Sequence, residues 1–253
     1  MRSSFLWAIL LTKLAGVVGW WVMPPGVAAV LFFGPDFAVV YQLLVPSSQQ
    51  LCQVVRRFET SRREIWLTID DGPDSEDTPR ILDLLDQHGA RATFFMIGAR
   101  AERYPGLVAE VVRRGHDVGC HTYSHPVGTF WCAGPRETER QIVDGLRALG
   151  AAAAAARTFR APVGIKSLFL ARVLERHDLR CVGWDVRAFD ARARHPDPVA
   201  VRVLRRVRPG AIILMHEGPQ MFPATRVNAL ALVLKGLRDQ GYACVVPPAA
   251  KWR

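Results

Sequence analysis

Two adjacent carboxylates, Asp70 and Asp71, are the residues of this sequence best suited to chemistry. An apolar run from Ile65 to Ile69 leads into them, and Gly72-Pro73 ends the strand that this run predicts. Because two acids side by side repel each other, folding favours their pairing with a metal ion or an arginine. Asp, Gly and Pro are also common in solvated turns, so other residues must decide between the two interpretations.

Two imidazoles, His121 and His125, stand four residues apart and therefore face the same way on a helical turn. Together with one of the two carboxylates they would make a facial His-His-Asp site, which suits Zn²⁺ and also Co²⁺, Ni²⁺ or Mn²⁺. A metal in such a site lowers the pKa of bound water toward about 7. The carboxylate that does not bind the metal would then be free to accept a proton.

Two further polar residues close predicted strands. His216 follows the apolar run 212–215, and Arg160 precedes the sequence 161–164. A histidine there can protonate a leaving group, and an arginine can hold the free carboxylate by a bidentate pair. The other interpretations are an imidazole bonded to backbone and an ordinary surface salt bridge. In a parallel barrel these residues would share one rim, and we expect Asp185 to join them there.

The chain from residue 64 onward alternates short β-branched or aromatic runs with amphipathic helical stretches. Strands alternating with helices pair in parallel, and about seven such units favour an α/β barrel over an open sheet. The predicted strands are Ile65–Asp70, Ala92–Ile97, Asp117–His121, Thr158–Ala161, Arg180–Asp185, Ala211–His216 and Ala243–Val246. The predicted helices are Thr78–His88, Leu107–Arg114, Arg136–Leu149, Ser167–His177, Pro198–Val207 and Thr225–Gln240.

The first forty-five residues are almost wholly apolar and predict a membrane segment. Two runs, 5–23 and 27–45, are each near the roughly 20 residues that a helix needs to cross a bilayer. Pro24-Pro25 breaks them apart, which favours a hairpin of two helices over a single span or a monotopic anchor. Lys13 and Asp36 lie within these runs, and we expect them to pair or to reach the membrane surface.

The distribution of arginine predicts how the hairpin is oriented. Arg2 precedes the first run and a basic stretch with Arg56, Arg57, Arg62 and Arg63 follows the second, whereas the turn between them is uncharged. The positive-inside rule places both ends in the cytoplasm, although a single span would export the globular domain. The formal net charge of +10 is spread over helical faces, so the sequence predicts contact with membrane lipid and no nucleic-acid partner. Five cysteines without a Cys-x-x-Cys pair suit a reducing compartment.

The sequences Thr68–Pro73, His121–His125, Arg160–Gly164 and Leu214–His216 resemble, in this order, the motifs of the polysaccharide deacetylase family, the NodB-homology carbohydrate esterases of family 4. The resemblance covers about residues 63–247, roughly three-quarters of the chain. It implies a distorted (β/α)7-type barrel of the NodB-homology fold. It also implies metal-dependent removal of an N-acetyl or O-acetyl group from a sugar.

The resemblance assigns roles residue by residue. Asp70 resembles the general base of the family, and His216 resembles the general acid. Arg160 resembles the arginine that orients the base. The metal ligands that the resemblance implies are Asp71, His121 and His125.

The remaining site residues come from less similar segments. The segment 184–190 resembles an Asp-Trp motif and makes Asp190 the partner of the acid, although Ala191 stands where tryptophan is common. Trp184 would supply an apolar wall. Val163 replaces an aromatic residue, but only its backbone N–H is needed to hold an oxyanion. Cys120 stands before His121 where a polar residue is usual, which bears on how the metal is tuned.

These assignments predict four segments, namely 1–46 as a transmembrane segment or hairpin, 47–63 as a basic linker, 64–248 as the catalytic domain and 249–253 as a C-terminal tail. The predicted protein is a membrane-bound deacetylase of an acylated amino sugar, in a glycan or a lipid-linked sugar, with its domain in the cytoplasm. Three alternatives remain: a deformylase of a lipid-linked amino sugar, a catalytically silent anchored carbohydrate-binding protein, and a basic binder of membrane surfaces or nucleic acid.

Overall fold

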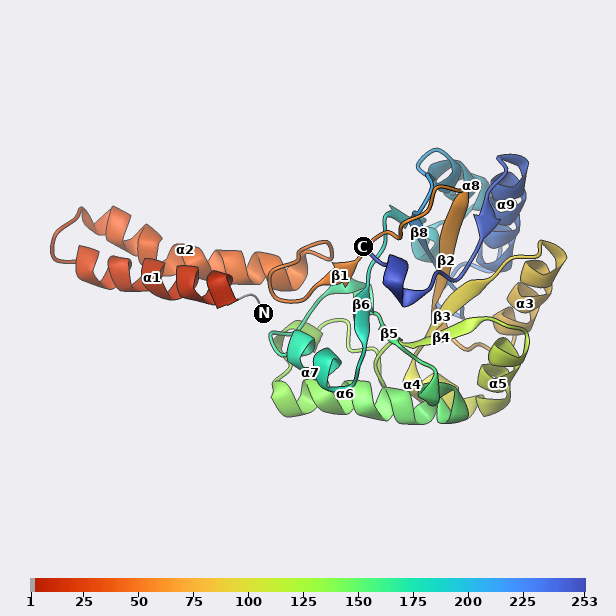
Figure 1. The fold of residues 1–253 in the computed structure, drawn as a ribbon, viewed down its shortest axis with the longest axis horizontal. Coiled ribbons are helices and arrows are strands. Elements are labelled where there is room, and N and C mark those ends of the chain that lie inside the picture. Colours follow the sequence, from red (N-terminus) through yellow and green to blue (C-terminus); the bar gives the residue numbers. More distant parts are fainter. Residues whose placement is uncertain (1–2) are drawn as a thin grey trace.

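The computed structural model describes residues 3–253, so Arg2, which the orientation argument uses, lies outside the described residues. The described residues begin with two antiparallel helices, α1 (Ser3–Gly19) and α2 (Pro25–Leu44), joined by a turn at residues 20–24. Figure 1 shows this hairpin projecting from one side of the globular domain, with its turn far from that domain. α2 continues through Pro35 without ending. The predicted pair of helices is therefore present in the structure.

Within the hairpin, Lys13 donates a hydrogen bond to Asp36 at 2.8 Å and another to the carbonyl of Phe32 at 3.0 Å, which confirms the predicted pairing. Most other side chains of both helices are apolar and exposed: Trp7 is 61% and Phe37 is 75% exposed. By length and composition α2 could cross a membrane, and the apolar part of α1 is shorter. An anchor or a signal segment would both explain such a surface.

The globular domain is built on a parallel sheet with the strand order β1-β6-β5-β4-β3-β2-β8-β7, and β9 adds to the start of β2. No ladder joins β1 to β7 within residues 3–253, so the sheet curves into a half-barrel with an open seam between its edge strands. The strands are β1 (Val54–Val55), β2 (Glu64–Gly72), β3 (Ala92–Met96), β4 (Asp117–Cys120), β5 (Thr158–Phe159), β6 (Arg180–Val182), β7 (Val186–Arg187), β8 (Ile212–His216) and β9 (Ala243–Cys244).

Helices surround the sheet on its outer side (Figure 1). They are α3 (Asp77–Gln87), α4 (Gly98–Arg103), α5 (Pro105–Arg113), α6 (Pro135–Ala148), α7 (Leu170–Arg176), α8 (Pro196–Leu204) and α9 (Arg226–Asp239). The predicted strands and helices are confirmed, with ends that differ by a few residues. β1, β7 and α4 were not predicted, because elements this short carry too little periodicity to detect.

Alternation along β2 explains how one strand serves both the core and the site. Leu67 and Ile69 belong to the large apolar cluster that joins the sheet to the outer helices. Trp66 belongs instead to a separate cluster with Phe95, on the other face. Because side chains alternate along a strand, Thr68 and Asp70 share the inner face with Trp66. The inner face of β2 thus changes from apolar to acidic toward its carboxyl end.

The C-terminal residues pack against the barrel. Trp252 stacks on Trp66 with ring centroids 5.5 Å apart, and the backbone N–H of Arg253 donates to the carbonyl of Arg57 at 2.8 Å. This contact closes the amino-terminal end of the inner face. The opposite end, where β2 and β8 finish in Asp70 and His216, remains available for chemistry.

Candidate active site

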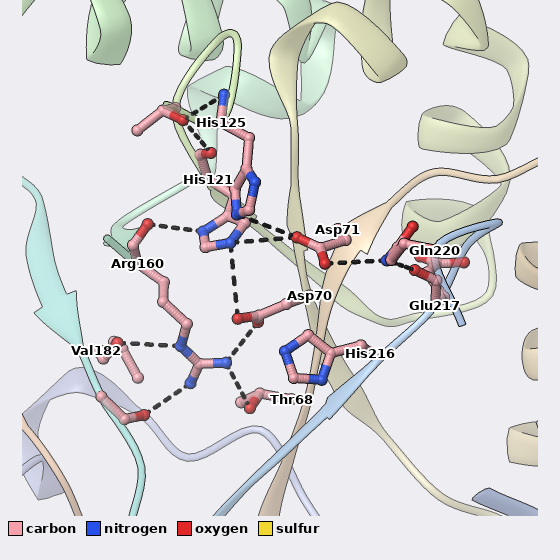
Figure 2. A network of polar contacts seen from close by, with 12 residues as sticks. Thr68, Asp70, Asp71, His121, His125, Arg160, Val182, His216, Glu217 and Gln220 are labelled. Atoms are coloured by element: carbon pink, nitrogen blue, oxygen red, sulfur yellow. Dashed lines mark hydrogen bonds and ion pairs between the residues drawn. The ribbon is translucent and has the colours of Figure 1, made fainter. Parts of the chain in front are cut away.

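Three predicted metal ligands come together at the carboxyl ends of β2 and β4 (Figure 2). One ligand atom from each of Asp71, His121 and His125 lies within 4.8 Å of the other two. Asp71 Oδ1 is 3.5 Å from His121 Nε2 and 3.3 Å from His125 Nε2. His121 Nδ1 is 2.8 Å from the carbonyl oxygen of Arg160, to which it donates, so Nε2 keeps a lone pair toward Asp71.

These three residues fit a divalent cation in their charge states as well as in their geometry. Burial alone would raise the pKa of Asp71, but the imidazoles of His121, His216 and His125 lower it below its usual range. Burial, reinforced by His121, lowers the pKa of His125 to about 4. The site therefore offers a carboxylate and a neutral imidazole near pH 7, which are the forms that bind metals. Asp71 Oδ1 is buried without a hydrogen-bond partner, which a bound cation would supply.

Backbone strain is concentrated around this site. Within residues 3–253, six residues other than glycine have positive φ angles, and five of them, all except Asp178, lie in the segments that carry the predicted site. Asp71 has φ 75° and His125 has φ 54°, while the β-branched Val163 has φ 49°. Such conformations cost about 1–3 kcal/mol each and persist where surrounding contacts enforce them. The positive φ angles of Asp71 and His125 set the direction of their side chains, and such strain is consistent with a functional site.

The second carboxylate, Asp70, is held by a buried arginine. Arg160 Nη1 donates to Asp70 Oδ1 at 2.6 Å and to Thr68 Oγ1 at 2.8 Å, while its other nitrogens donate to the carbonyls of Val182 and Gly183. The expected bidentate pair is therefore wrong, because Nη2 and Nε are used by the backbone. Asp70 Oδ2 is left facing the ligand cluster, 3.8 Å from His121 Nε2.

His216 lies directly beside Asp70, because β2 and β8 pair in parallel with these two residues in register. Asp190 accepts hydrogen bonds from the His216 backbone N–H at 2.7 Å and from its Nδ1 at 2.8 Å. Burial would lower the pKa of His216, but the Asp190 carboxylate outweighs it and raises the pKa to about 9. The imidazole is therefore protonated at neutral pH, with Nε2 as its free donor.

The comparisons with known proteins agree with this geometry. The family model described as polysaccharide deacetylase matches residues 57–182. A chitooligosaccharide deacetylase of Sinorhizobium fredii is 36% identical over 201 residues, which cover 75% of this chain and 93% of that protein. The chain belongs to the polysaccharide deacetylase family. It is an enzyme of the class that hydrolyses carbon–nitrogen bonds other than peptide bonds.

Further relatives support this family assignment. A peptidoglycan-N-acetylglucosamine deacetylase of Bacillus cereus is 34% identical over 190 residues, covering 75% of this chain and 68% of that protein. The crystal structure of the peptidoglycan N-acetylglucosamine deacetylase Bc1960 with a hydroxamate has a TM-score of 0.71, 33% identity, and covers 77% of this chain and 90% of the other. The half-barrel of this deacetylase is thus the NodB-homology fold that the motifs implied.

Two residues that support the site in this polysaccharide deacetylase were not found from the sequence. Gln220 Nε2 donates to Asp71 Oδ2 at 3.0 Å, and Arg100 donates to the backbone carbonyl of Asp71 and to Gln220 Oε1. Gln220 holds the carboxylate oxygen of Asp71 that faces away from the imidazoles (Figure 2), and Arg100 in turn holds Gln220. No motif marks a lone glutamine or arginine at such separations, so only the folded chain identifies them.

Three other predicted residues have different outcomes in the deacetylase structure. The ring of Trp184 lies 6.0 Å from the guanidinium carbon of Arg160, and Val163 lies in the loop that follows Arg160.

The expectation that Asp185 joins the rim is wrong. The backbone N–H of Asp185 donates to the carbonyl of Ile212 at the start of β8. Its carboxylate accepts hydrogen bonds from Arg208 Nη2 at 2.7 Å and from Arg208 Nε at 2.8 Å. Asp185 therefore lies near the amino-terminal ends of β7 and β8.

Proposed function

We propose that this deacetylase removes the acetyl group from an N-acetylated amino sugar, using one divalent metal ion held by Asp71, His121 and His125. The observation that carries the proposal is the buried, unpartnered oxygen of Asp71 facing two imidazole nitrogens. Zn²⁺ suits this donor set best. The two relatives are named for deacetylation of chitooligosaccharides and of peptidoglycan N-acetylglucosamine, which favours an N-acetyl over an O-acetyl group.

A metal in this site would supply Lewis-acid polarisation of the acyl carbonyl and lower the pKa of water there. Asp70 would accept the proton of the attacking water through Oδ2, because Arg160 occupies its Oδ1. The base is thus separated from the metal ligand by a single peptide unit, yet oriented by a different partner.

His216 would protonate the departing amine through Nε2, since Asp190 occupies Nδ1. Its raised pKa of about 9 keeps the proton available at neutral pH. The backbone N–H of Val163 would hold the tetrahedral oxyanion, in line with its position just after Arg160. Trp184 would supply an apolar wall beside the base.

We further propose that α1 and α2 anchor the enzyme in the cytoplasmic membrane. Residues 47–63 would be a basic linker that also contributes β1 to the sheet, residues 64–248 the catalytic domain, and residues 249–253 a C-terminal tail packed against it. The exposed apolar side chains of the hairpin support an anchor. The basic residues after α2 support a cytoplasmic location of the domain.

The experiment measures acetate release from tri-N-acetylchitotriose by the zinc-loaded full chain, together with metal content. Asp70→Asn is expected to lower turnover by about 10²- to 10⁴-fold, the range for a positioned acid or base, while metal content stays unchanged. Asp197→Asn, an exposed carboxylate on α8, is the matched control and should keep full turnover. Near wild-type activity of Asp70→Asn would contradict the assignment of the base. A metal-loaded wild type that releases acetate from neither tri-N-acetylchitotriose nor a lipid-linked N-acetylglucosamine would contradict the proposed function.

A further inference from the structure

A cavity of about 280 Å³ lies at the open seam of the half-barrel, beside the end of the hairpin. Arg56, just after β1, and Arg187, in β7, come from the two edge strands that do not pair. Pro46 and Ser47, which follow α2, line the cavity, and Trp184 and Phe189 complete its wall. Its size is near the lower limit of roughly 300 Å³ for small-ligand sites.

Two arginine side chains without an acidic partner line the cavity within residues 3–253. Neither Arg56 nor Arg187 forms a salt bridge or a side-chain hydrogen bond with any residue between 3 and 253, and Arg187 Nε is buried without a partner. The one carboxylate in the lining, Asp185, is already neutralised by Arg208 and lies 3.6 Å from Arg57. Because an unsatisfied buried donor on a charged group is costly, the cavity favours an anionic ligand.

Aromatic rings hold the arginine in place. The guanidinium carbon of Arg187 is 5.5 Å from the ring centroid of Trp184 and 4.9 Å from that of Phe189. Such cation–π contacts orient a guanidinium without using its N–H donors. Arg187 is therefore preorganised to bind a planar or tetrahedral anion bidentately.

The cavity directly follows the apolar helix α2, whose end is fixed to the catalytic domain. The buried Lys166 donates through Nζ to the carbonyl of Val45 at 2.7 Å, and its backbone N–H donates to the carbonyl of Leu43 at 2.9 Å. Gly164 packs so closely against Pro46 and Trp184 that a Cβ there would collide with both. When the hairpin lies in a bilayer, the cavity is at the level where lipid phosphates lie.

Two residues that line the cavity also neighbour residues that hold the catalytic groups. The Trp184 ring is 6.0 Å from the guanidinium carbon of Arg160, which binds Asp70. Phe189 precedes Asp190, which binds His216. Trp184 and Phe189 thus connect the cavity to Arg160 and Asp190, the residues that hold the base and the acid.

We infer that the cavity between Arg56 and Arg187 binds the phosphate or diphosphate through which a membrane lipid carries the N-acetylated sugar. The substrate class is then a lipid-linked amino sugar rather than a neutral polymer. This inference rests on the proposed function, since it assigns the carrier of the sugar that is deacetylated. A neutral glycan can offer hydroxyl and carbonyl acceptors, but it carries no negative charge to pair with the guanidinium groups of Arg56 and Arg187.

The test compares two substrates of the zinc-loaded full chain in uncharged, phosphate-free detergent micelles. One is farnesyl diphospho-N-acetylglucosamine, and the other is farnesyl N-acetylglucosaminide, which has the same tail and sugar but no phosphate. The wild type should show a higher kcat/KM for the diphosphate. Arg187→Gln and Arg56→Gln should each lower the ratio of the two values about tenfold or more, the typical effect of losing a charge-assisted hydrogen bond. Arg172→Gln, an exposed arginine on α7, makes the same charge change and should preserve the ratio.

The outcomes separate this inference from the proposed function. Deacetylation of both farnesyl compounds with equal kcat/KM would overturn the phosphate site and leave the deacetylase function intact. If neither compound is deacetylated, the phosphate site is tested by measuring the affinity of wild type and of Arg187→Gln for farnesyl monophosphate. Tighter binding by the wild type supports the site, and equal binding overturns it. Vesicles of phosphatidylglycerol and phosphatidylcholine distinguish the source of phosphate. Suppose that Arg187→Gln leaves the ratio of the two kcat/KM values unchanged but binds phosphatidylglycerol vesicles more weakly than the wild type does. The ligand of the cavity would then be a bilayer headgroup, and the substrate assignment would be overturned.

Discussion

The rim of the half-barrel and the N-terminal hairpin use charged residues in opposite ways. The rim buries several ionisable groups together, among them Asp70, Asp71 and His121, and connects them to Arg160 and Gln220. The hairpin has one charge pair, Lys13 with Asp36, on a surface of exposed apolar side chains. The rim is thus organised by directional contacts, whereas the exposed apolar surface of the hairpin would be buried by a lipid bilayer.

This difference shows where each region obtains its specificity. Burying a charge costs free energy unless a partner compensates it, so each buried group at the rim depends on a particular neighbour. A lipid-facing helix needs only length and apolarity, and many sequences supply both. Substitutions at the rim should therefore have large and distinct effects, whereas those in the hairpin should leave turnover unchanged. The following predictions test that contrast from the largest expected effect to the smallest.

Removal of a ligand should have the largest effect. Loss of a group that is hydrogen-bonded to a metal ligand lowers metal affinity by roughly 10- to 100-fold. His125→Ala removes a ligand itself, so we expect a larger loss of zinc affinity and no acetate release. Zinc content after dialysis against a metal buffer measures this loss. His195→Ala, an exposed histidine before α8, should retain both zinc and turnover. Retention of zinc by His125→Ala would remove this residue from the metal site.

The pair of His216 and Asp190 predicts a pH dependence. The acid must be protonated to act, so turnover should fall as pH rises through the His216 pKa of about 9. Asp190→Asn removes the carboxylate that raises this pKa and should move the alkaline limb of kcat to lower pH. The measurement is a pH profile of kcat for both proteins with zinc saturating. An unchanged alkaline limb would show that another group limits turnover there.

Gln220 provides an intermediate test of the rim. Gln220→Leu removes the donor to Asp71 Oδ2 and should weaken zinc binding by roughly 10- to 100-fold, with a smaller change in turnover once zinc is saturating. Competition with a chelator of known affinity measures the change. Gln87→Leu, exposed at the end of α3, is the matched control. If both variants bind zinc equally well, the contact of Gln220 does not tune the metal site.

The hairpin should give the smallest effect on catalysis. Replacing Lys13 and Asp36 together by leucine removes both charges, so turnover in detergent is expected to remain within about twofold, because exposed ion pairs contribute roughly 0–1 kcal/mol. Lys13→Leu alone leaves Asp36 unpaired in an apolar segment and should reduce the membrane-bound fraction in alkaline extraction. A loss of turnover in the double variant would contradict the independence of the two regions.

Much of the site could be predicted because its residues close strands. Asp70, Asp71 and His216 end long apolar runs, and parallel pairing brings the carboxyl ends of such strands to one edge. The same reasoning failed for Asp185, because β7 pairs low on β8 and places that carboxylate near Ile212 instead. Strand ends predict a shared rim only when the register is also known.

The sequence by itself determined the chemical groups, the alternation of strands and helices, and the apolar hairpin with its paired Lys13 and Asp36. These features depend on local composition and on periodicity, which are visible along a chain. Only the tertiary structure decided that Gln220 orients Asp71 and that Arg56 and Arg187 face one cavity. The physical reason is that each contact joins residues more than a hundred positions apart, and their register is fixed by the packing of the whole sheet.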